Sequence, residues 1–256
     1  MTDLNEIHGA LDRNEFFLEY LPTMSLADGR CIGAEALIRW RRHGGVTPPS
    51  EFIPVAENTS LSGLITYWVL ETVGTELGEW LEANSDMHIA INAPPEILGR
   101  GALAYVASRA GLSKITSQLI LEITERGVPD LIGVASINAR GHVGAKMALD
   151  DVTLVGGGNL AILARSNFDI IKLDKSLIDQ IAGEGPDPDW LRTVSALVHA
   201  SDLTVIAEGV ESQQQVLRLR AASIQAAQGF YFSRPIGASA LMAFSRDHGT
   251  MSSTVH

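Results

Sequence analysis

The chain has 256 residues, of which 46% are hydrophobic and 19% charged, so its composition is typical of a globular protein and excludes a disordered one. Its 19 lysines and arginines against 30 aspartates and glutamates give a formal net charge of −11, which excludes the basic surface of a protein that binds polymeric nucleic acid. A single cysteine, a polar first segment and the lack of an apolar run of about eighteen residues predict a cytoplasmic chain without disulfides, secretory signal or membrane span.

The first predicted elements form a β-hairpin. Residues 16–21 have the composition of a strand, Asp28 and Gly29 mark a turn, and a second strand is predicted from Cys31 to about Trp40. Two strands that follow each other through a short turn must run antiparallel.

From residue 60 onward the chain alternates between helical and strand patterns. Apolar spacing predicts helices over residues 60–81, around residues 190–198 and from about residue 239, and Ser212 with Gln215 resembles a capping box. The predicted strands are residues 87–92, 119–124, 146–150, 170–174, 203–208 and 224–226. This alternation predicts an α/β protein with parallel strands, and the number of strands favours a closed TIM-type (β/α)8 barrel over an open doubly wound sheet. We expect one domain over residues 1–248 and a polar tail over residues 249–256.

Acidic and amide residues gather where the predicted strands end. The set comprises Asn92, Glu122, Asp150, Asp151, Lys172, Asp174 and Glu208. The carboxyl ends of all the strands of such a barrel meet on one face, so these side chains would surround one pocket. Several carboxylates in one pocket repel each other unless a cation joins them, and oxygen ligands suit Mg²⁺ or Mn²⁺. No pair of histidines has the spacing of a zinc site.

Two of these residues also have a purely structural interpretation. Asp174 precedes Lys175 and Ser176 and could be a helix N-cap. Lys172 could do no more than pair with a neighbouring carboxylate. The agreement among several strand ends favours a metal-binding site at the mouth of the barrel.

Short motifs along most of the chain resemble those of one known family. The segment Glu35–Trp40, with the sequence Glu-Ala-Leu-Ile-Arg-Trp, is similar to the signature of the EAL domain, the bacterial cyclic di-GMP phosphodiesterase family. The other similar segments are Pro49–Glu57, Ile91–Pro94, Leu121–Glu125, Asp150–Asp151, Lys172–Asp174, Ala207–Glu211, Gln228–Phe230 and Ser233–Pro235. One tetrapeptide alone is unspecific, but their order and spacing from about Phe16 to Pro235 make the resemblance specific.

The resemblance implies a TIM-type barrel whose first strand is antiparallel, in agreement with the hairpin. It also implies hydrolysis of cyclic di-GMP to linear pGpG by a water activated between two Mg²⁺ or Mn²⁺ ions. The implied metal ligands are Glu35, Asn92, Glu122, Asp150 and Asp151. The implied catalytic residues are Lys172 at the water or the phosphoryl oxygen, Glu208 near the metals or the water, and Glu125, which would brace the loop after Asp151. The implied substrate contacts are the backbone of Leu37, Arg39, Asp174, Gln228 and Pro235.

Two departures from the family pattern leave other functions open. Leu21 follows Tyr20 where the family usually has a glutamine, and a leucine can neither donate nor accept a hydrogen bond. The loop after Asp151 is one residue longer than usual and contains three consecutive glycines, residues 156–158. The chain could therefore be an impaired EAL domain that acts as a cyclic di-GMP receptor or a protein-interaction module, or an unrelated Mg²⁺-dependent barrel enzyme.

The resemblance also allows two kinds of protein partner. Family members use the loop after the paired aspartates for dimer contact, which allows a homodimer through the loop after Asp151. Family members are often joined to sensor or cyclase domains, which allows a fused or separate sensor domain here.

Overall fold

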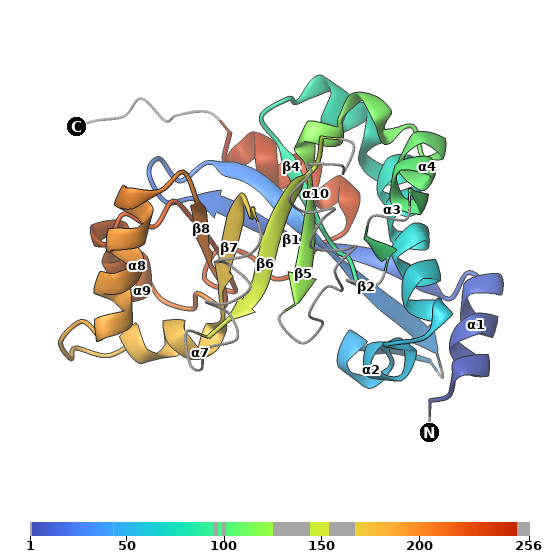
Figure 1. Cartoon of the computed structure of the whole chain (residues 1–256), viewed down its shortest axis with the longest axis horizontal. Coiled ribbons are helices and arrows are strands. Elements are labelled where there is room, and N and C mark those ends of the chain that lie inside the picture. Colours follow the sequence, from blue (N-terminus) through green and yellow to red (C-terminus); the bar gives the residue numbers. More distant parts are fainter. Residues whose placement is uncertain are drawn as a thin grey trace.

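The computed structural model describes residues 2–42, 44–94, 97–98, 101–124, 144–153 and 167–249 (Figure 1). The strands are β1 (Phe16–Ser25), β2 (Cys31–Arg42), β3 (Gly45–Thr47), β4 (His88–Asn92), β5 (Leu119–Thr124), β6 (Lys146–Val152), β7 (Ile170–Leu173), β8 (Thr204–Ala207) and β9 (Ala226–Gln228). The α-helices are α1 (Leu4–Asp12), α2 (Ile53–Ala56), α3 (Ser60–Ala83), α4 (Ala102–Arg109), α7 (Lys175–Ile178), α8 (Asp189–Ala200), α9 (Gln213–Ala221) and α10 (Ala238–Asp247). The short 3-10 helices are η1 (Pro49–Glu51), η3 (Leu112–Lys114), η4 (Thr116–Gln118) and η5 (Asp179–Ile181).

Eight of the strands close into a TIM-type barrel, as predicted. The ring runs β1-β9-β8-β7-β6-β5-β4-β2 and is closed by the pairing of β1 with β2, while β3 extends β2 outside the ring. β1 is antiparallel to both of its neighbours, and all the other pairs in the ring are parallel. The hairpin turn between β1 and β2 contains Gly29 with a φ of 72°, a conformation that glycine adopts readily.

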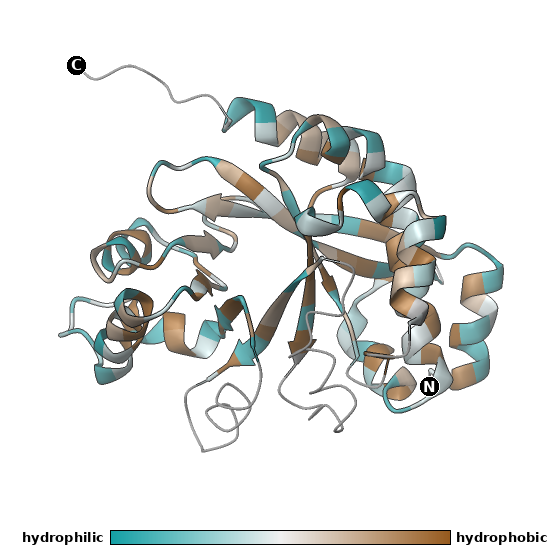
Figure 2. Ribbon diagram, turned by 45° about the horizontal axis from the view of Figure 1, so that its top comes forward, coloured by the Kyte–Doolittle hydropathy of each residue, from teal (hydrophilic) through white to brown (hydrophobic). Residues whose placement is uncertain are grey.

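Two apolar clusters lie outside the barrel wall. One packs α1, α3, α4 and α10 against β1, β2 and β4, and the other packs α7, α8 and α9 against β5 to β9. Figure 1 shows these two groups of helices on opposite sides of the strands, and Figure 2 shows hydrophobic residues along the strands between them. None of the helices in the described ranges combines the length and the apolar character that crossing a membrane would require.

A third apolar cluster lies inside the barrel, and we call it the lower layer. Its members are Ala90, Ile120, Ala148, Ile170, Ile206 and Ala226, one from each of β4 to β9. Residues two apart on a strand face the same side of the sheet, so the next inward position of each strand lies nearer the mouth of the barrel. Those positions are Asn92, Glu122, Asp150, Lys172, Glu208 and Gln228. Together with Glu35 of β2 we call them the polar layer.

The sequence predictions and the structure differ mainly at strand ends. The last strand was predicted at residues 224–226, but β9 spans Ala226–Gln228. Just before β9, the side chain of Gln225 contacts the neighbouring strand in place of a backbone pairing: its Oε1 accepts from the backbone N of Val205 in β8 at 2.9 Å. The capping box of Ser212 and Gln215 at the start of α9 is confirmed. Glu125 and residues 154–160 and 250–256 lie outside the described residues, so the predictions made for them stay predictions.

Candidate active site

A buried lysine lies at the centre of the polar layer. The Nζ atom of Lys172 is 2.7 Å from Glu122 Oε1, 2.7 Å from Glu208 Oε1, 3.0 Å from Glu35 Oε2 and 3.3 Å from Asp150 Oδ1. Its side chain and that of Glu122 are each only 1% exposed. Lys172 therefore does pair with neighbouring carboxylates, and an ammonium with three protons serves four acids, while its predicted catalytic role stays a prediction.

Glu35 connects the hairpin to the parallel strands. Its Oε2 accepts from Gln228 Nε2 at 2.6 Å, and its Oε1 accepts from Asn92 Nδ2 at 3.2 Å. Gln228 Nε2 also donates to Glu208 Oε1 at 2.8 Å, and Gln228 Oε1 accepts from the hydroxyl of Thr23 at 3.2 Å. Thr23 was not predicted as a site residue. The only signal in its sequence context is the alternation of residues along β1, which does not distinguish Thr23 from other strand residues.

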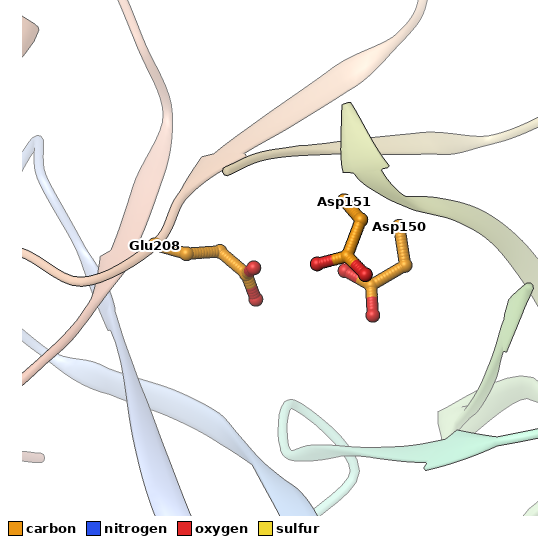
Figure 3. A group of neighbouring side chains, drawn as sticks. All are labelled: Asp150, Asp151 and Glu208. Atoms are coloured by element: carbon orange, nitrogen blue, oxygen red, sulfur yellow. The ribbon is translucent and has the colours of Figure 1, made fainter. Parts of the chain in front are cut away.

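Asp150, Asp151 and Glu208 bring their carboxylates together at one point. One oxygen from each lies within 4.8 Å of the others, and Figure 3 shows the three side chains converging from the end of β6 and from the residue after β8. Adjacent residues of a regular strand face opposite sides of the sheet. Asp151, however, has a φ of 56°, and the register of β6 against β7 shifts between Leu149 and Val152. This bulge is why two consecutive aspartates can reach the same site.

Burial and mutual repulsion set the protonation of the polar layer. Burial, followed by the charge of Glu35, raises the pKa of Glu122 well above its ordinary value. Burial also raises the pKa of Asp150, and it raises that of Glu208 to about 8. Burial opposes ionisation of Glu35 as well, but the charge of Lys172 and three hydrogen bonds lower its pKa. Burial alone would lower the pKa of Lys172, but the surrounding carboxylates raise it well above its ordinary value.

The donor set fits divalent cations. Glu122 Oε2 and Asp150 Oδ1 are buried and accept no hydrogen bond from the described residues, although Asp150 Oδ1 lies near the ammonium of Lys172. Four carboxylates surround Lys172 and that of Asp151 lies close to two of them, so the formal negative charge of the five acids exceeds what one lysine can neutralise. Hard oxygen donors of this kind are the ligands that Mg²⁺ and Mn²⁺ prefer. Glu35, Asn92, Glu122, Asp150, Asp151 and Glu208 could hold such ions.

A cavity opens beside this cluster. It has a volume of about 510 Å³ and lies between β2, α2 and the first half of α3. Leu37, Asn92 and Glu122 are part of its lining, so the predicted substrate contact at Leu37 adjoins two predicted metal ligands. Most of the rest of its wall is apolar, as is typical of small-molecule sites.

The hairpin contributes one wall of the mouth. Leu21 is directly opposite Glu35 in the β1–β2 register, so the residue that departs from the family pattern faces the polar layer. Arg39 lies two pleats above Glu35 on the same face, and its Nε donates to Glu19 Oε2 at 2.8 Å. Sequence analysis did not identify Glu19, although its position two residues before Leu21 places it on the same inward face.

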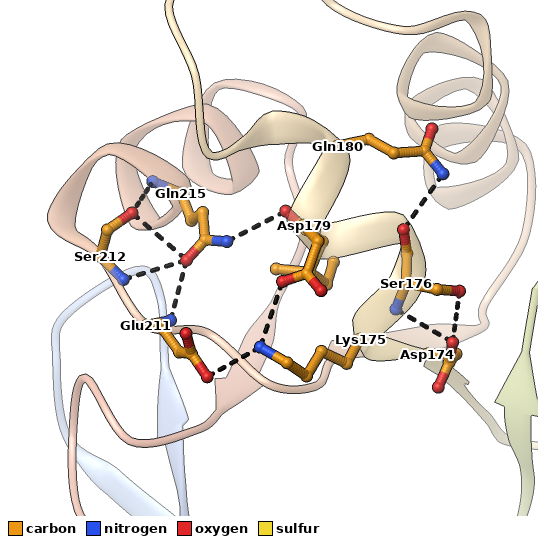
Figure 4. Close-up of polar contacts among 9 residues, drawn as sticks. Asp174, Lys175, Ser176, Asp179, Gln180, Glu211, Ser212 and Gln215 are labelled. Carbon is orange, nitrogen blue, oxygen red and sulfur yellow. Dashed lines mark hydrogen bonds and ion pairs between the residues drawn. The ribbon is translucent and has the colours of Figure 1, made fainter.

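Asp174 acts as a helix cap in the structure. Its Oδ1 accepts from the backbone N of Ser176 at 3.0 Å at the start of α7, which confirms the N-cap interpretation (Figure 4). Its predicted contact with substrate stays a prediction. Pro235 lies directly before Ile236, whose backbone N donates to Tyr20 O of β1 at 2.9 Å.

A polar network joins α7 to the loop that carries Glu208 (Figure 4). Lys175 Nζ lies 2.7 Å from Glu211 Oε1, and Gln215 Nε2 donates to the backbone O of Ile178 at 3.0 Å. Gln215 Oε1 accepts from the backbone N of Glu211 at 2.8 Å, and the Gln215 side chain is buried. Because α7 follows β7, these contacts fix the loop after β8 against the strand that carries Lys172.

The predicted residues therefore fall into four groups. The structure brings together Glu35, Asn92, Glu122, Asp150, Asp151, Lys172, Glu208 and Gln228. Leu37 and Arg39 lie on the adjoining wall of β2, whereas Asp174 and Pro235 make their described contacts outside the cluster. Glu125 lies outside the described residues.

Comparisons with known proteins place the chain among EAL domain proteins. A family model described as the EAL domain matches residues 4–235. The chain is 29% identical over 249 residues to the probable cyclic di-GMP phosphodiesterase PdeB of Escherichia coli, covering 95% of this chain and 47% of that protein. It is 31% identical over 250 residues to the bifunctional diguanylate cyclase/cyclic di-GMP phosphodiesterase MucR of Pseudomonas aeruginosa, covering 94% of this chain and 36% of MucR. The chain thus spans about half or less of the length of these relatives.

The fold is also that of solved structures of such proteins. A structure described as the PaMucR phosphodiesterase in complex with c-di-GMP superposes with a TM-score of 0.80 at 29% identity, covering 93% of this chain and 98% of that chain. The cGMP-bound form of the EAL enzyme Bd1971 superposes with a TM-score of 0.83 at 25% identity, covering 94% of this chain and 68% of that chain.

Proposed function

The chain belongs to the EAL domain family, and from this premise we propose that it is a metal-dependent phosphodiesterase that hydrolyses cyclic di-GMP to linear pGpG. The observation that carries the proposal is the convergence of Asp150, Asp151 and Glu208 beside the buried Glu35 and Glu122. Relatives named as cyclic di-GMP phosphodiesterases support the substrate and the reaction.

The residues of the polar layer would act by binding metal ions at fixed positions beside the substrate. Bound Mg²⁺ or Mn²⁺, which we propose as a pair of ions, would lower the pKa of a water and neutralise charge on the phosphodiester. Glu35, Asn92, Glu122, Asp150 and Asp151 would hold these ions.

The remaining site residues would bind substrate and orient the attacking water. Glu208 would lie beside the metals or the attacking water, because its carboxylate converges with those of Asp150 and Asp151. Lys172 would orient the attacking water or a phosphoryl oxygen, and Arg39 would bind a phosphate at the mouth.

The receptor alternative rests on Leu21 and on the altered loop after Asp151, most of which lies outside the described residues. Leu21 faces Glu35 where a glutamine would offer a polar contact to the substrate. The completeness of the metal-ligand set within the described residues favours the enzyme over the receptor.

The test is a chromatographic assay for pGpG with and without Mn²⁺, on the wild type, on Glu35→Ala and on Glu6→Ala. Glu6 is a suitable control because it is an acid of α1 whose partner is Arg42 at 3.5 Å. We expect Mn²⁺-dependent product from the wild type and from Glu6→Ala, and none from Glu35→Ala. Absence of product above the Glu35→Ala background at high enzyme concentration would refute the enzymatic function. Calorimetry on the same samples would then separate a receptor, which binds without turnover, from a protein-interaction module, which does not bind.

The remaining features of the protein follow as proposals from family membership. We propose one domain over residues 1–248, a location in the cytoplasm, a homodimer through the loop after Asp151, and a fused or separate sensor domain.

A further inference from the structure

Arg39 forms an ion pair with Glu19 at the mouth of the barrel. Its Nε donates to Glu19 Oε2 at 2.8 Å, and its Nη1 donates to the backbone O of Ile38 at 3.1 Å. The side chain of Arg39 is 15% exposed and that of Glu19 is 33% exposed, so the pair is partly shielded from water and still reachable from the mouth. The protons of Nη2 have no partner within the described parts of the chain.

The register of the hairpin places this pair above the polar layer. Leu21 is opposite Glu35, and Glu19 is opposite Leu37, which lines the cavity beside Asn92 and Glu122. Residues opposite each other in an antiparallel pair have their side chains on the same face. A phosphate that contacts the guanidinium of Arg39 would therefore also lie near the carboxylate of Glu19.

We propose that Glu19 lowers the affinity of the site for cyclic di-GMP by competing with the anionic substrate for Arg39. The inference rests on the proposed function and on the predicted phosphate contact of Arg39. Glu19 cancels most of the local charge of the guanidinium, so a dianionic cyclic dinucleotide gains less at Arg39 than it would at an unpaired arginine. Together with Leu21, which offers no polar contact, the face of β1 toward the mouth lowers affinity for the substrate.

The size of the effect follows from the exposure of the pair. Ion pairs that water can reach are weak, and their loss corresponds to a change of about two- to fivefold in an equilibrium constant. Glu19→Gln keeps an oxygen that can accept from Arg39 Nε and removes only the charge. Glu19→Ala removes the charge and the contact that orients the guanidinium.

The experiment compares KM and kcat for cyclic di-GMP in the presence of Mn²⁺ for five proteins: wild type, Glu19→Gln, Glu19→Ala, Arg39→Ala and the double variant Glu19→Gln/Arg39→Ala. Glu6→Gln is the matched control, because Glu6 pairs with Arg42, which stacks over Trp40 on the outer face of β2 at 4.4 Å. We expect Glu19→Gln to lower KM by about two- to fivefold with kcat unchanged. Glu19→Ala should lower KM less than Glu19→Gln does, and Glu6→Gln should leave KM unchanged.

Two further readouts distinguish competition for Arg39 from other effects. The KM of Glu19→Gln should rise more steeply with added salt than that of the wild type, because the guanidinium is then uncompensated. The effect of Glu19→Gln should disappear in the Arg39→Ala background.

An unchanged or higher KM in Glu19→Gln, or an equal fall of KM in the Arg39→Ala background, would overturn the inference. A wild type that forms no pGpG refutes the proposed phosphodiesterase, and the same variants are then ranked by their calorimetric Kd for cyclic di-GMP. In that case a tighter Kd for Glu19→Gln supports the inference, and equal Kd values or no binding overturn it.

Discussion

The interior of the barrel contains two layers of side chains that lie two residues apart along each strand. One layer is apolar and the other is charged and polar. The lower layer is built from alanines and isoleucines such as Ile120, Ile170 and Ile206. The polar layer, two residues further along the same strands, contains Glu122, Lys172 and their partners. The lower layer gains free energy from burial alone, whereas the polar layer needs matched charges. The same strands therefore carry residues that stabilise the barrel and, two residues further along, residues of the candidate active site.

The largest expected effect comes from Lys172→Met in the polar layer. The change leaves four buried carboxylates without their ammonium, so the free energy of unfolding in EDTA should fall by about 3–5 kcal/mol. Added Mg²⁺ should restore more stability to this variant than to the wild type, because the ion replaces the lost charge. Urea denaturation with and without Mg²⁺ measures both quantities. An equal gain from Mg²⁺ in the two proteins would contradict the electrostatic account.

A substitution in the lower layer tests the other half of the comparison. Ile206→Ala removes a buried side chain that is 7% exposed and should lower the free energy of unfolding by about 3 kcal/mol through lost burial and a cavity. Mg²⁺ should stabilise this variant by the same amount as the wild type, as followed by the same denaturation series. A larger gain from Mg²⁺ in Ile206→Ala would show that the two layers are not separate.

The acids of the polar layer should also make the free energy of unfolding depend on pH. In the folded chain the pKa of Glu208 is raised to about 8, because of burial first and neighbouring acids next. A raised pKa favours the protonated form in the folded state, so this contribution is complete below the ordinary pKa of a glutamate and is lost as pH rises through about 8. In EDTA the free energy of unfolding should therefore decrease between about pH 5 and about pH 9. Denaturation midpoints of Glu208→Gln, which should fall less steeply with pH than those of the wild type because Glu122 and Asp150 also have raised pKa values, provide the control.

The smallest expected effect concerns the apolar residue that faces the polar layer. Leu21→Gln supplies a donor and an acceptor opposite Glu35 and should improve substrate binding by about 1 kcal/mol, which is roughly a fivefold lower KM. Leu217→Gln makes the same change at a residue of α9 that is 56% exposed, and it should leave KM unchanged. Steady-state kinetics with cyclic di-GMP compares the two variants. Unchanged KM and kcat in Leu21→Gln would show that this position does not contact substrate.

Much of the site could be predicted from strand-end residues. Glu122, Asp150 and Lys172 stand out in the sequence as charged residues in apolar strands, and parallel strands must bring such positions to one end of the barrel. Their pairing could not be predicted, because Lys172 and Glu35 are 137 residues apart and several strand ends compete for one ammonium. Glu19 was not predicted, because an acid in a hairpin strand is common and only the three-dimensional structure shows that it contacts Arg39.

The sequence by itself determined the alternation of strands and helices, the antiparallel first strand and the polar residues at the ends of the parallel strands, because periodicity and turn chemistry are local properties. Glu35 and Gln228 were predicted only through the resemblance to the EAL domain family. Only the tertiary structure decided which of these residues touch. Barrel closure placed Gln228 2.6 Å from Glu35, although they are 193 residues apart. The bulge with a φ of 56° at Asp151 turned two consecutive aspartates toward one site, against the alternation that the sequence of β6 would otherwise impose.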